Sequence, residues 1–221
     1  MFRSQKHVFW QALIVTIFVF GIGIFVGILI ENSRLNNVNE LYEISGLNLL
    51  DLKLIDSIYS EDYFNCEFAE QENIALADKI YEEARLLEDY QEASRLTSDK
   101  IDIEHKKYDI LRAMLFVNSL KIKSKCNSSY INVIYFYDYN DPSLEIKSRQ
   151  EVISRLLGDL KSELGNKILL IPIAGDNDII SIKILMNQYN ISESELPVIL
   201  INEKYRINDV QNLESLLEYF D

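Results

Sequence analysis

The sequence contains few of the residues that most often carry chemistry in small proteins. It has two cysteines and two histidines in 221 residues, and no Cys-x-x-Cys pair. A zinc cluster therefore has too few ligands. Basic residues are also scarce, with 22 Lys and Arg against 35 Asp and Glu and a formal net charge of −13. Because such a surface repels polyanions, nucleic acid is not expected as a partner. No metal site and no cofactor are expected either, since no motif for one is found in the sequence.

The shortage of positive charge is greatest between residues 40 and 78. Ten acidic residues accompany one basic residue, Lys53, in this stretch. A solvated helical surface is the simplest interpretation. A docking surface for a basic partner is the alternative.

Glycine and proline are nearly absent from residues 35–125, where Gly46 is the only one. Their absence removes the usual helix breakers, so this region is expected to be helical. Apolar residues recur at helical spacing in residues 36–59, and the stripe consists of Leu47, Leu50, Leu54 and Ile58.

The next two segments predict an antiparallel α-hairpin. Residues 62–94 carry the stripe Ala77, Ile80, Ala84 and Leu87, and the helix that ends near residue 125 carries Tyr108, Leu111, Leu115 and Asn118. Small residues on the first stripe would allow close approach of the two helices. A long coiled-coil stalk is the alternative, but the heptads are not sustained. His105 is expected on an exposed face of the second helix, without a special role.

Residues 8–30 contain no charge at all. As a helix rising about 1.5 Å per residue, this segment spans roughly the 30 Å of a bilayer's hydrocarbon core. It is longer than the apolar part of a signal peptide, about 7–15 residues, and no Ala-x-Ala site follows it. The sequence therefore predicts an uncleaved transmembrane helix.

The flanks of this segment predict its orientation. Arg3 and Lys6 precede it and Glu31 follows it, and basic residues favour the cytoplasmic side. We expect a single-pass protein of the cell membrane, with residues 1–7 in the cytoplasm and the C-terminal part outside. Gly23 and Gly27 form a GxxxG pair that is compatible with homo-oligomers.

Cys66 and Cys126 lie sixty residues apart. An extracytoplasmic location favours a structural disulfide between them. Closing a loop of this length stabilises the fold by about 4 kcal/mol in the chain-entropy model. Two free buried thiols are the alternative.

From residue 131 the sequence alternates between strand and helix patterns. Strands are predicted over 131–139, 168–173, 196–201 and 205–207, and helices over 144–165, 179–190 and 210–220. The order β-α-β-α-β-β-α predicts an α/β domain over residues 126–221. With the segments above, the expected organisation is 1–7, 8–30, a helical spacer over 31–125, and 126–221.

Two short segments carry a family resemblance. Asn140-Asp141-Pro142-Ser143 joins the first strand to a helix, and Pro197 follows Leu196 directly before the third strand. Together with the element order, these segments resemble the thioredoxin family, with Asn140 and Ser143 in place of the two redox cysteines. The resemblance implies a cis-proline loop, with Leu196 placed to contact extended polypeptide.

The missing cysteines decide the expected function. Thiol–disulfide exchange requires a thiolate, which neither Asn140 nor Ser143 supplies, so no catalytic residue is expected there. We predict a non-catalytic, membrane-anchored binding, scaffold or chaperone-like protein whose partner is an extended polypeptide or another envelope protein. One alternative is an oxidoreductase that uses Cys66 and Cys126. Another is a structural membrane spacer that oligomerises.

Overall fold

The computed structural model describes the backbone of residues 6–61, 63–93, 98–128 and 130–220. The chain divides into two compact units, Met1–Glu43 and Ile44–Asp221. Arg3, one of the two basic residues behind the predicted orientation, lies outside the described residues. The helical region after residue 43 and the strand-containing region belong to the same unit.

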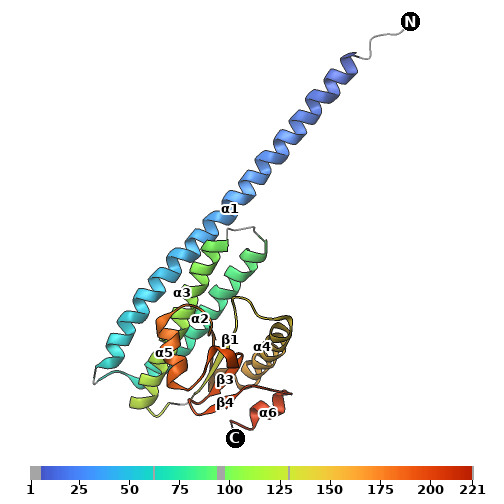
Figure 1. The fold of residues 1–221 in the computed structure, drawn as a ribbon. Helices are drawn as coiled ribbons and strands as arrows, with labels where there is room; N and C mark the ends of the chain where they lie inside the picture. Colours follow the sequence, from blue (N-terminus) through green and yellow to red (C-terminus); the bar gives the residue numbers. More distant parts are fainter. Residues whose placement is uncertain (1–5, 62, 94–97, 129, 221) are drawn as a thin grey trace. The chain divides into compact units, whose positions relative to one another are not determined.

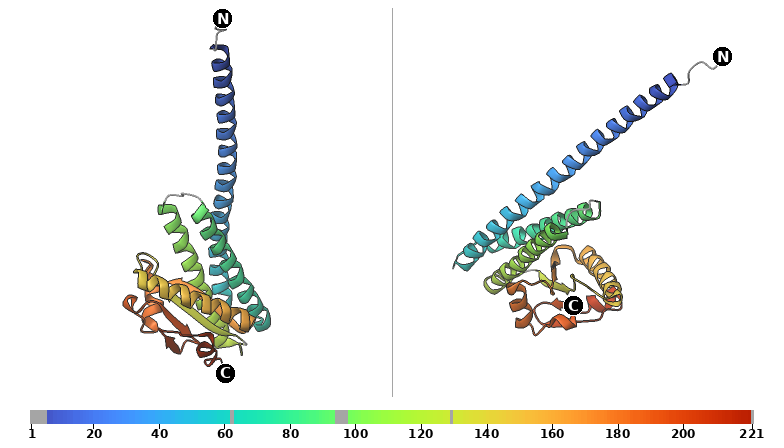
Figure 2. Two further views of the ribbon diagram at one scale, coloured as in Figure 1. Left: turned by 90° about the vertical axis from the view of Figure 1, so that its right-hand side faces the viewer. Right: turned by 45° about the horizontal axis from the view of Figure 1, so that its top comes forward.

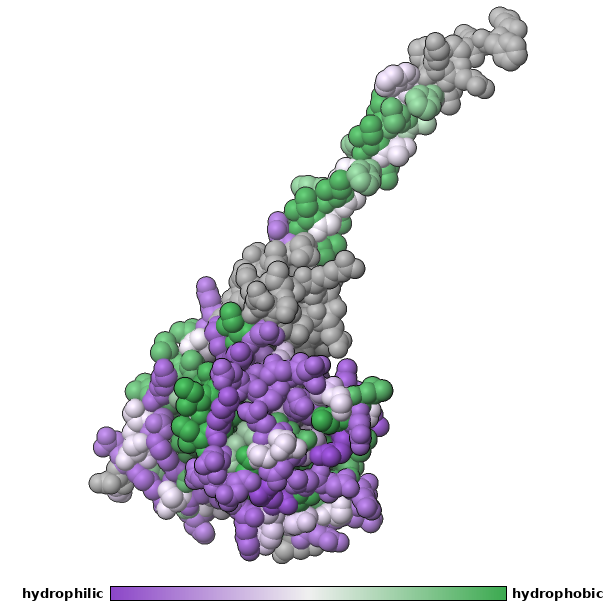
Figure 3. Space-filling view, in the orientation of Figure 1, coloured by the Kyte–Doolittle hydropathy of each residue, from purple (hydrophilic) through white to green (hydrophobic). Residues whose placement is uncertain are grey.

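The first unit consists of the N-terminal part of helix α1 (Lys6–Ser60). Its segment Phe9–Ile30 has 22 residues with a mean hydropathy of 3.0 and is nowhere buried. Figure 3 shows it as an almost continuous hydrophobic surface. By length and composition, this helix can cross a membrane. A Cβ added at Gly23 or Gly27 would meet no other atom within 4 Å.

The C-terminal part of α1 belongs to the second unit and does not bury the apolar stripe found in the sequence. Leu47, Leu50, Leu54 and Ile58 are all exposed, whereas Ser45, Asn48, Leu52 and Tyr59 are buried. The polar members of the buried face are hydrogen-bonded: the Ser45 hydroxyl to Glu104 at 3.1 Å, and the Asn48 amide to Glu83 at 2.8 Å. The prediction of a helix is confirmed here. Its packed face is the more polar one, because carboxylates from distant helices meet it.

Helices α2 (Cys66–Ala93) and α3 (Ser98–Lys125) lie side by side as an antiparallel hairpin (Figures 1 and 2). The predicted contact residues of α2 that the structure describes are buried, namely Ala77, Ile80 and Ala84. The side chain of Leu87 lies outside the described residues. The predicted stripe of α3, Tyr108, Leu111, Leu115 and Asn118, is also buried.

Four strands form one mixed sheet in the order β2-β1-β3-β4. Their bounds are Ile131–Tyr137 for β1, Ile168–Ala174 for β2, Val198–Ile201 for β3 and Tyr205–Ile207 for β4. β1 pairs in parallel with β2 and antiparallel with β3, and β4 pairs antiparallel with β3. The prediction of an α/β region is therefore confirmed. Pro172 lies in β2, an edge strand, where a residue without an amide hydrogen is tolerated.

Each face of the sheet is covered by helices. Helices α4 (Leu144–Leu164) and α6 (Leu213–Leu217) pack on the face that carries Val133, Tyr135 and Ile199. Helix α5 (Ile180–Gln188) contacts α3, and α3 also contacts β2. The hairpin thus reaches the β2 side of the sheet, where its side chains meet those that follow β1 and β2.

Candidate functional site

The turn between β1 and α4 uses its polar side chains to hold the backbone. The Ser143 hydroxyl caps α4 by accepting a hydrogen bond from the Ile146 amide at 3.3 Å. The Asn140 side-chain amide donates to the carbonyl of Asp176 at 3.1 Å, and the Asn140 backbone amide donates to the Asp176 carboxylate at 2.6 Å. Both residues at the expected redox positions therefore have a local structural role.

Carboxylates gather at this turn. Asp138 lies beside Asp176 and Asp141, and partial burial followed by the neighbouring Asp176 raises the pKa of Asp138 above its ordinary value. The Asp176 carboxylate is already occupied by the backbone amides of Tyr139 and Asn140. Among the described residues, no cluster of three or more ligating side chains is placed to hold a metal ion.

The Leu196–Pro197 peptide bond is cis. The Leu196 side chain is buried, and a Cβ added at Gly175 would lie 3.0 Å from it and from the sulfur of Met186 in α5. The Pro197 carbonyl accepts a hydrogen bond from Arg149 of α4 at 3.3 Å. The loop is thus tied to α4, but the side chain of Leu196 points to the α5 side.

Cys66 and Cys126 form a disulfide, as predicted. The bond joins the first residue of α2 to the residue that follows α3. It lies in a small cluster with Tyr59, Ala69 and Ile122. This disulfide fastens the open end of the hairpin and does not belong to the turn after β1.

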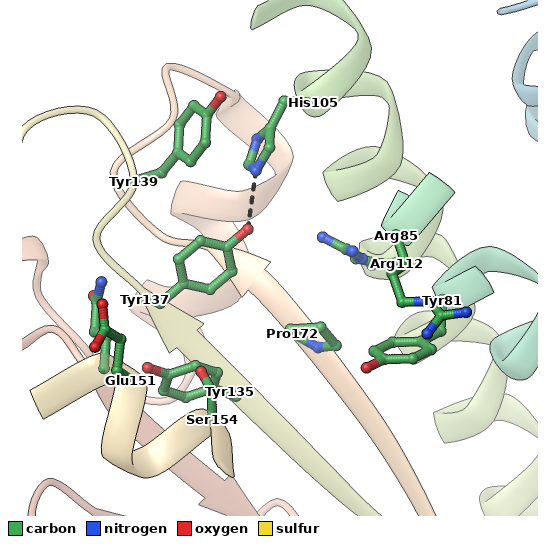
Figure 4. A pocket seen from close by; sticks show the side chains of 11 residues that line it. Tyr81, Arg85, His105, Arg112, Tyr135, Tyr137, Tyr139, Glu151, Ser154 and Pro172 are labelled. Atoms are coloured by element: carbon green, nitrogen blue, oxygen red, sulfur yellow. Dashed lines mark hydrogen bonds between the residues drawn. The ribbon is translucent and has the colours of Figure 1, made fainter. Parts of the chain in front are cut away.

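A pocket of about 340 Å³ lies where the hairpin meets β1 and α4 (Figure 4). Its walls include Tyr81, Tyr135, Tyr137, Tyr139, His105 and Arg112, and we call it the tyrosine pocket. Burial raises the pKa of Tyr135 to about 12, so this phenol stays neutral at physiological pH. The pocket combines aromatic surface with polar groups that come from three helices and a strand.

A chain of three side chains runs into the wall of the tyrosine pocket. The Tyr137 hydroxyl lies 3.0 Å from Nε2 of His105 (Figure 4), and Nδ1 of the same ring lies 3.0 Å from Oδ2 of Asp109. The His105 side chain is only 11% exposed and that of Asp109 is fully buried. The expectation of an exposed His105 was wrong, because the sheet covers the helix face that carries it.

A second cavity of about 440 Å³ continues from the tyrosine pocket and shares Tyr81, Tyr135 and Pro172 with it. Its walls come from α2 and α4, and we call the two cavities together the α2–α4 groove. Asp78 of α2 and Lys161 of α4 form an ion pair at 3.5 Å along it. Tyr135, Tyr137 and Tyr139 thus line this groove, whereas Leu196, which the resemblance placed to contact polypeptide, does not.

Sequence reasoning missed His105, Asp109 and the groove. The one local signal was the spacing of His105, Asp109 and Arg112 at i, i+4 and i+7, which places them on one helix face. Comparison with protein-family models, with curated proteins and with solved structures finds no match for this chain.

Proposed function

We propose that this chain is a single-pass, membrane-anchored protein with an extracytoplasmic thioredoxin-like domain that binds polypeptide and performs no thiol exchange. The element order β-α-β-α-β-β-α and the cis bond before Pro197 support the thioredoxin-like assignment. The apolar segment Phe9–Ile30 supports the anchor. A disulfide supports an oxidising compartment outside the cytoplasm.

The placement of the cysteines supports the proposed lack of thiol exchange. Asn140 and Ser143 stand where the redox cysteines would be, and both are hydrogen-bonded into the turn, while the chain's two cysteines are bonded to each other at the hairpin. A thiolate nucleophile is therefore missing at the helix N-terminus, where exchange enzymes place it. The full chain in detergent is expected not to accelerate the reduction of insulin by dithiothreitol. Clear turnover would contradict this part of the proposal.

The α2–α4 groove is the proposed polypeptide site. It consists of two adjoining cavities, its lining includes the aromatic side chain of Tyr135 and the ring of Pro172, and helices form both walls. Aromatic side chains supply much of the affinity of peptide-binding surfaces because they bury large areas at low entropic cost. An extended segment fits such a groove better than a folded surface does.

The groove can be tested with a pair of exposed tyrosines. Tyr81 lies in the groove and Tyr63 lies outside it, with exposures of 54% and 96%. Reduced and carboxymethylated ribonuclease A, labelled with a fluorophore, serves as the unfolded polypeptide. Tyr81→Ala is expected to weaken its binding about tenfold, as for an aromatic hot spot, while Tyr63→Ala leaves it unchanged. Equal affinities of the two variants would argue against the groove.

A further inference from the structure

The hydroxyl of Tyr137 faces a cavity and has a histidine nitrogen within hydrogen-bonding distance. A carboxylate accepts hydrogen bonds and cannot donate them, so Nδ1 of His105 donates to Asp109 at 3.0 Å. In the neutral ring, Nε2 is then the acceptor, and the Tyr137 hydroxyl donates to it. This order of groups matches an activated nucleophile, a base and a residue that orients the base.

Asp109 is fixed from several elements. Its carboxylate accepts hydrogen bonds from the backbone amide of Ala174 at 3.2 Å and from the Asn177 side-chain amide at 2.5 Å, and Arg112 lies 3.4 Å away. These groups come from the end of β2, the loop after it, and α3. The orienting carboxylate therefore cannot turn away from the imidazole without losing its other partners.

Aromatic contacts also fix the orientation of the His105 imidazole ring. The ring of Tyr139 stacks on that of His105, with the centroids 3.5 Å apart and the planes 15° from parallel. The Tyr137 ring meets the imidazole edge-on. A base fixed in this way is pre-organised for one proton transfer, which is what general-base catalysis requires.

We propose that Tyr137 is a catalytic nucleophile of the tyrosine pocket, with His105 as its general base and Asp109 as a positioning residue, and that it accepts the acyl group of small uncharged carboxylic esters. The Tyr137 oxygen forms a bond to the ester carbonyl carbon, and the phenol proton moves to Nε2 of His105. The bond to the alkoxy group then breaks, and the alcohol leaves with that proton. Water, deprotonated by His105, hydrolyses the acyl-tyrosine to the carboxylic acid and restores the phenol.

The charges around the pocket favour an uncharged ester over a phosphate or another anion. Two guanidinium groups, those of Arg85 and Arg112, line the pocket, but each is beside a carboxylate, Glu82 at 3.0 Å and Asp109 at 3.4 Å. Glu151 adds a further negative charge to the lining. The charges therefore leave no net positive field for an anion. Figure 4 shows the Arg112 guanidinium facing the same cavity as the Tyr137 hydroxyl, where it can stabilise the negative oxygen that develops during attack.

The test uses the full chain in detergent with 4-nitrophenyl acetate as the probe. Release of nitrophenolate is followed by absorbance, and the acetylated residue is identified by mass spectrometry of rapidly quenched samples. A general base contributes about 100-fold or more, so Tyr137 is expected to be acetylated at least about 100-fold faster than the surface residue Tyr205. Acetylation of Tyr137 no faster than that of Tyr205 would overturn the proposal.

Three variants distinguish loss of the nucleophile from loss of the folded structure. His105→Asn places an amide near the position of Nδ1, so a donor to Asp109 is kept while Nε2 is removed. It is expected to lose the about 100-fold rate advantage with an unchanged circular dichroism spectrum. Tyr137→Phe keeps the ring and is expected to abolish the fast phase. Tyr63→Phe makes the same change at an exposed tyrosine outside the pocket and is expected to keep the fast phase. An unchanged rate in His105→Asn, or equal losses in Tyr137→Phe and Tyr63→Phe, would refute the assigned roles whatever happens to polypeptide binding.

Discussion

Polar side chains have different roles in the turn after β1 and in the tyrosine pocket beside it. In the turn, the side chains of Asn140 and Ser143 are hydrogen-bonded to nearby backbone groups. In the pocket, Tyr137 and His105 are ordered by a buried carboxylate and border an open cavity. The turn is held by hydrogen bonds within its own loop and to Asp176 in the loop after β2. The pocket, by contrast, exists only because the helical hairpin packs on the sheet.

The two regions differ in what their side chains hold. Those of the turn stabilise its backbone. The paired side chains of Tyr137 and His105 come from β1 and α3, two elements that are far apart in the sequence. The helices before β1 therefore form part of the tyrosine pocket.

The largest expected effect comes from removing the carboxylate that joins the helical hairpin to the sheet. Asp109→Ala removes the buried negative charge beside Arg112 and the acceptor for the amide of Ala174. Breaking a buried ion pair on one side costs about 3–5 kcal/mol, so we expect a loss of about 4 kcal/mol in denaturant unfolding of the full chain in detergent. Asp159→Ala, on the exposed side of α4, is the matched control. A loss below about 1 kcal/mol, as for a surface site, would show that hairpin and sheet are not coupled through Asp109.

The disulfide should have the next largest effect. Replacing Cys66 and Cys126 together by Ala is expected to lower the free energy of unfolding by about 3 kcal/mol, below the about 4 kcal/mol of the chain-entropy model because denatured chains retain structure. Since the bond closes the hairpin away from the turn, insulin reduction by the wild type and the double variant should be equally absent. A difference in that assay would instead favour an exchange role for these cysteines.

The cap of α4 tests the structural reading of the turn. Ser143→Ala removes the acceptor for the Ile146 amide and is expected to cost about 1 kcal/mol. Ser148→Ala is the control, because that hydroxyl donates to the Leu144 carbonyl within the helix, a bond that adds little stability. The same unfolding measurement should show no loss for Ser148→Ala. Equal effects of the two substitutions would mean that Ser143 does not act as a cap.

The smallest expected effect is a dependence on pH at the same turn. Burial and the adjacent Asp176 raise the pKa of Asp138 in the folded state, so the folded protein binds the proton more tightly than the unfolded chain. The associated stability is present below the ordinary aspartate pKa of about 3.9 and is lost as the pH rises through the folded value. Asp138→Asn should therefore be more stable than the wild type at pH 7, and the difference should vanish near pH 3. A variant that is less stable at pH 7 would reverse the assigned sign.

Much of the fold follows from local sequence. The buried strands could be predicted because β1 consists of β-branched and aromatic residues with one interruption, Asn132. The turn at Asn202 could be predicted from its polar residues. Strand β1 nevertheless ends at Tyr137, two residues earlier than expected. There the Asp138 amide donates a hydrogen bond to the Gln150 side chain in place of a neighbouring strand. The hydrophobic pattern of the sequence does not reveal this interaction.

The packed face of α1 and the tyrosine pocket could not be predicted because both depend on partners far along the chain. Asn48 is buried since Glu83 meets it, and His105 is covered since Tyr137 and Tyr139 reach it from the sheet. Hydrophobic periodicity selects the apolar face of a helix and assigns polar residues to solvent. That assumption fails where charged and polar groups on different elements satisfy one another.

The proline in β2 has a consequence for the proposed binding of polypeptide in the groove. Pro172 lies on an edge strand and forms part of the groove floor. A segment cannot extend the sheet by regular strand addition across a residue that has no amide hydrogen. For the proposed polypeptide ligand, selectivity must then come from side chains and from shape. The same residue interrupts an edge strand, and so discourages edge-to-edge joining of neighbouring molecules.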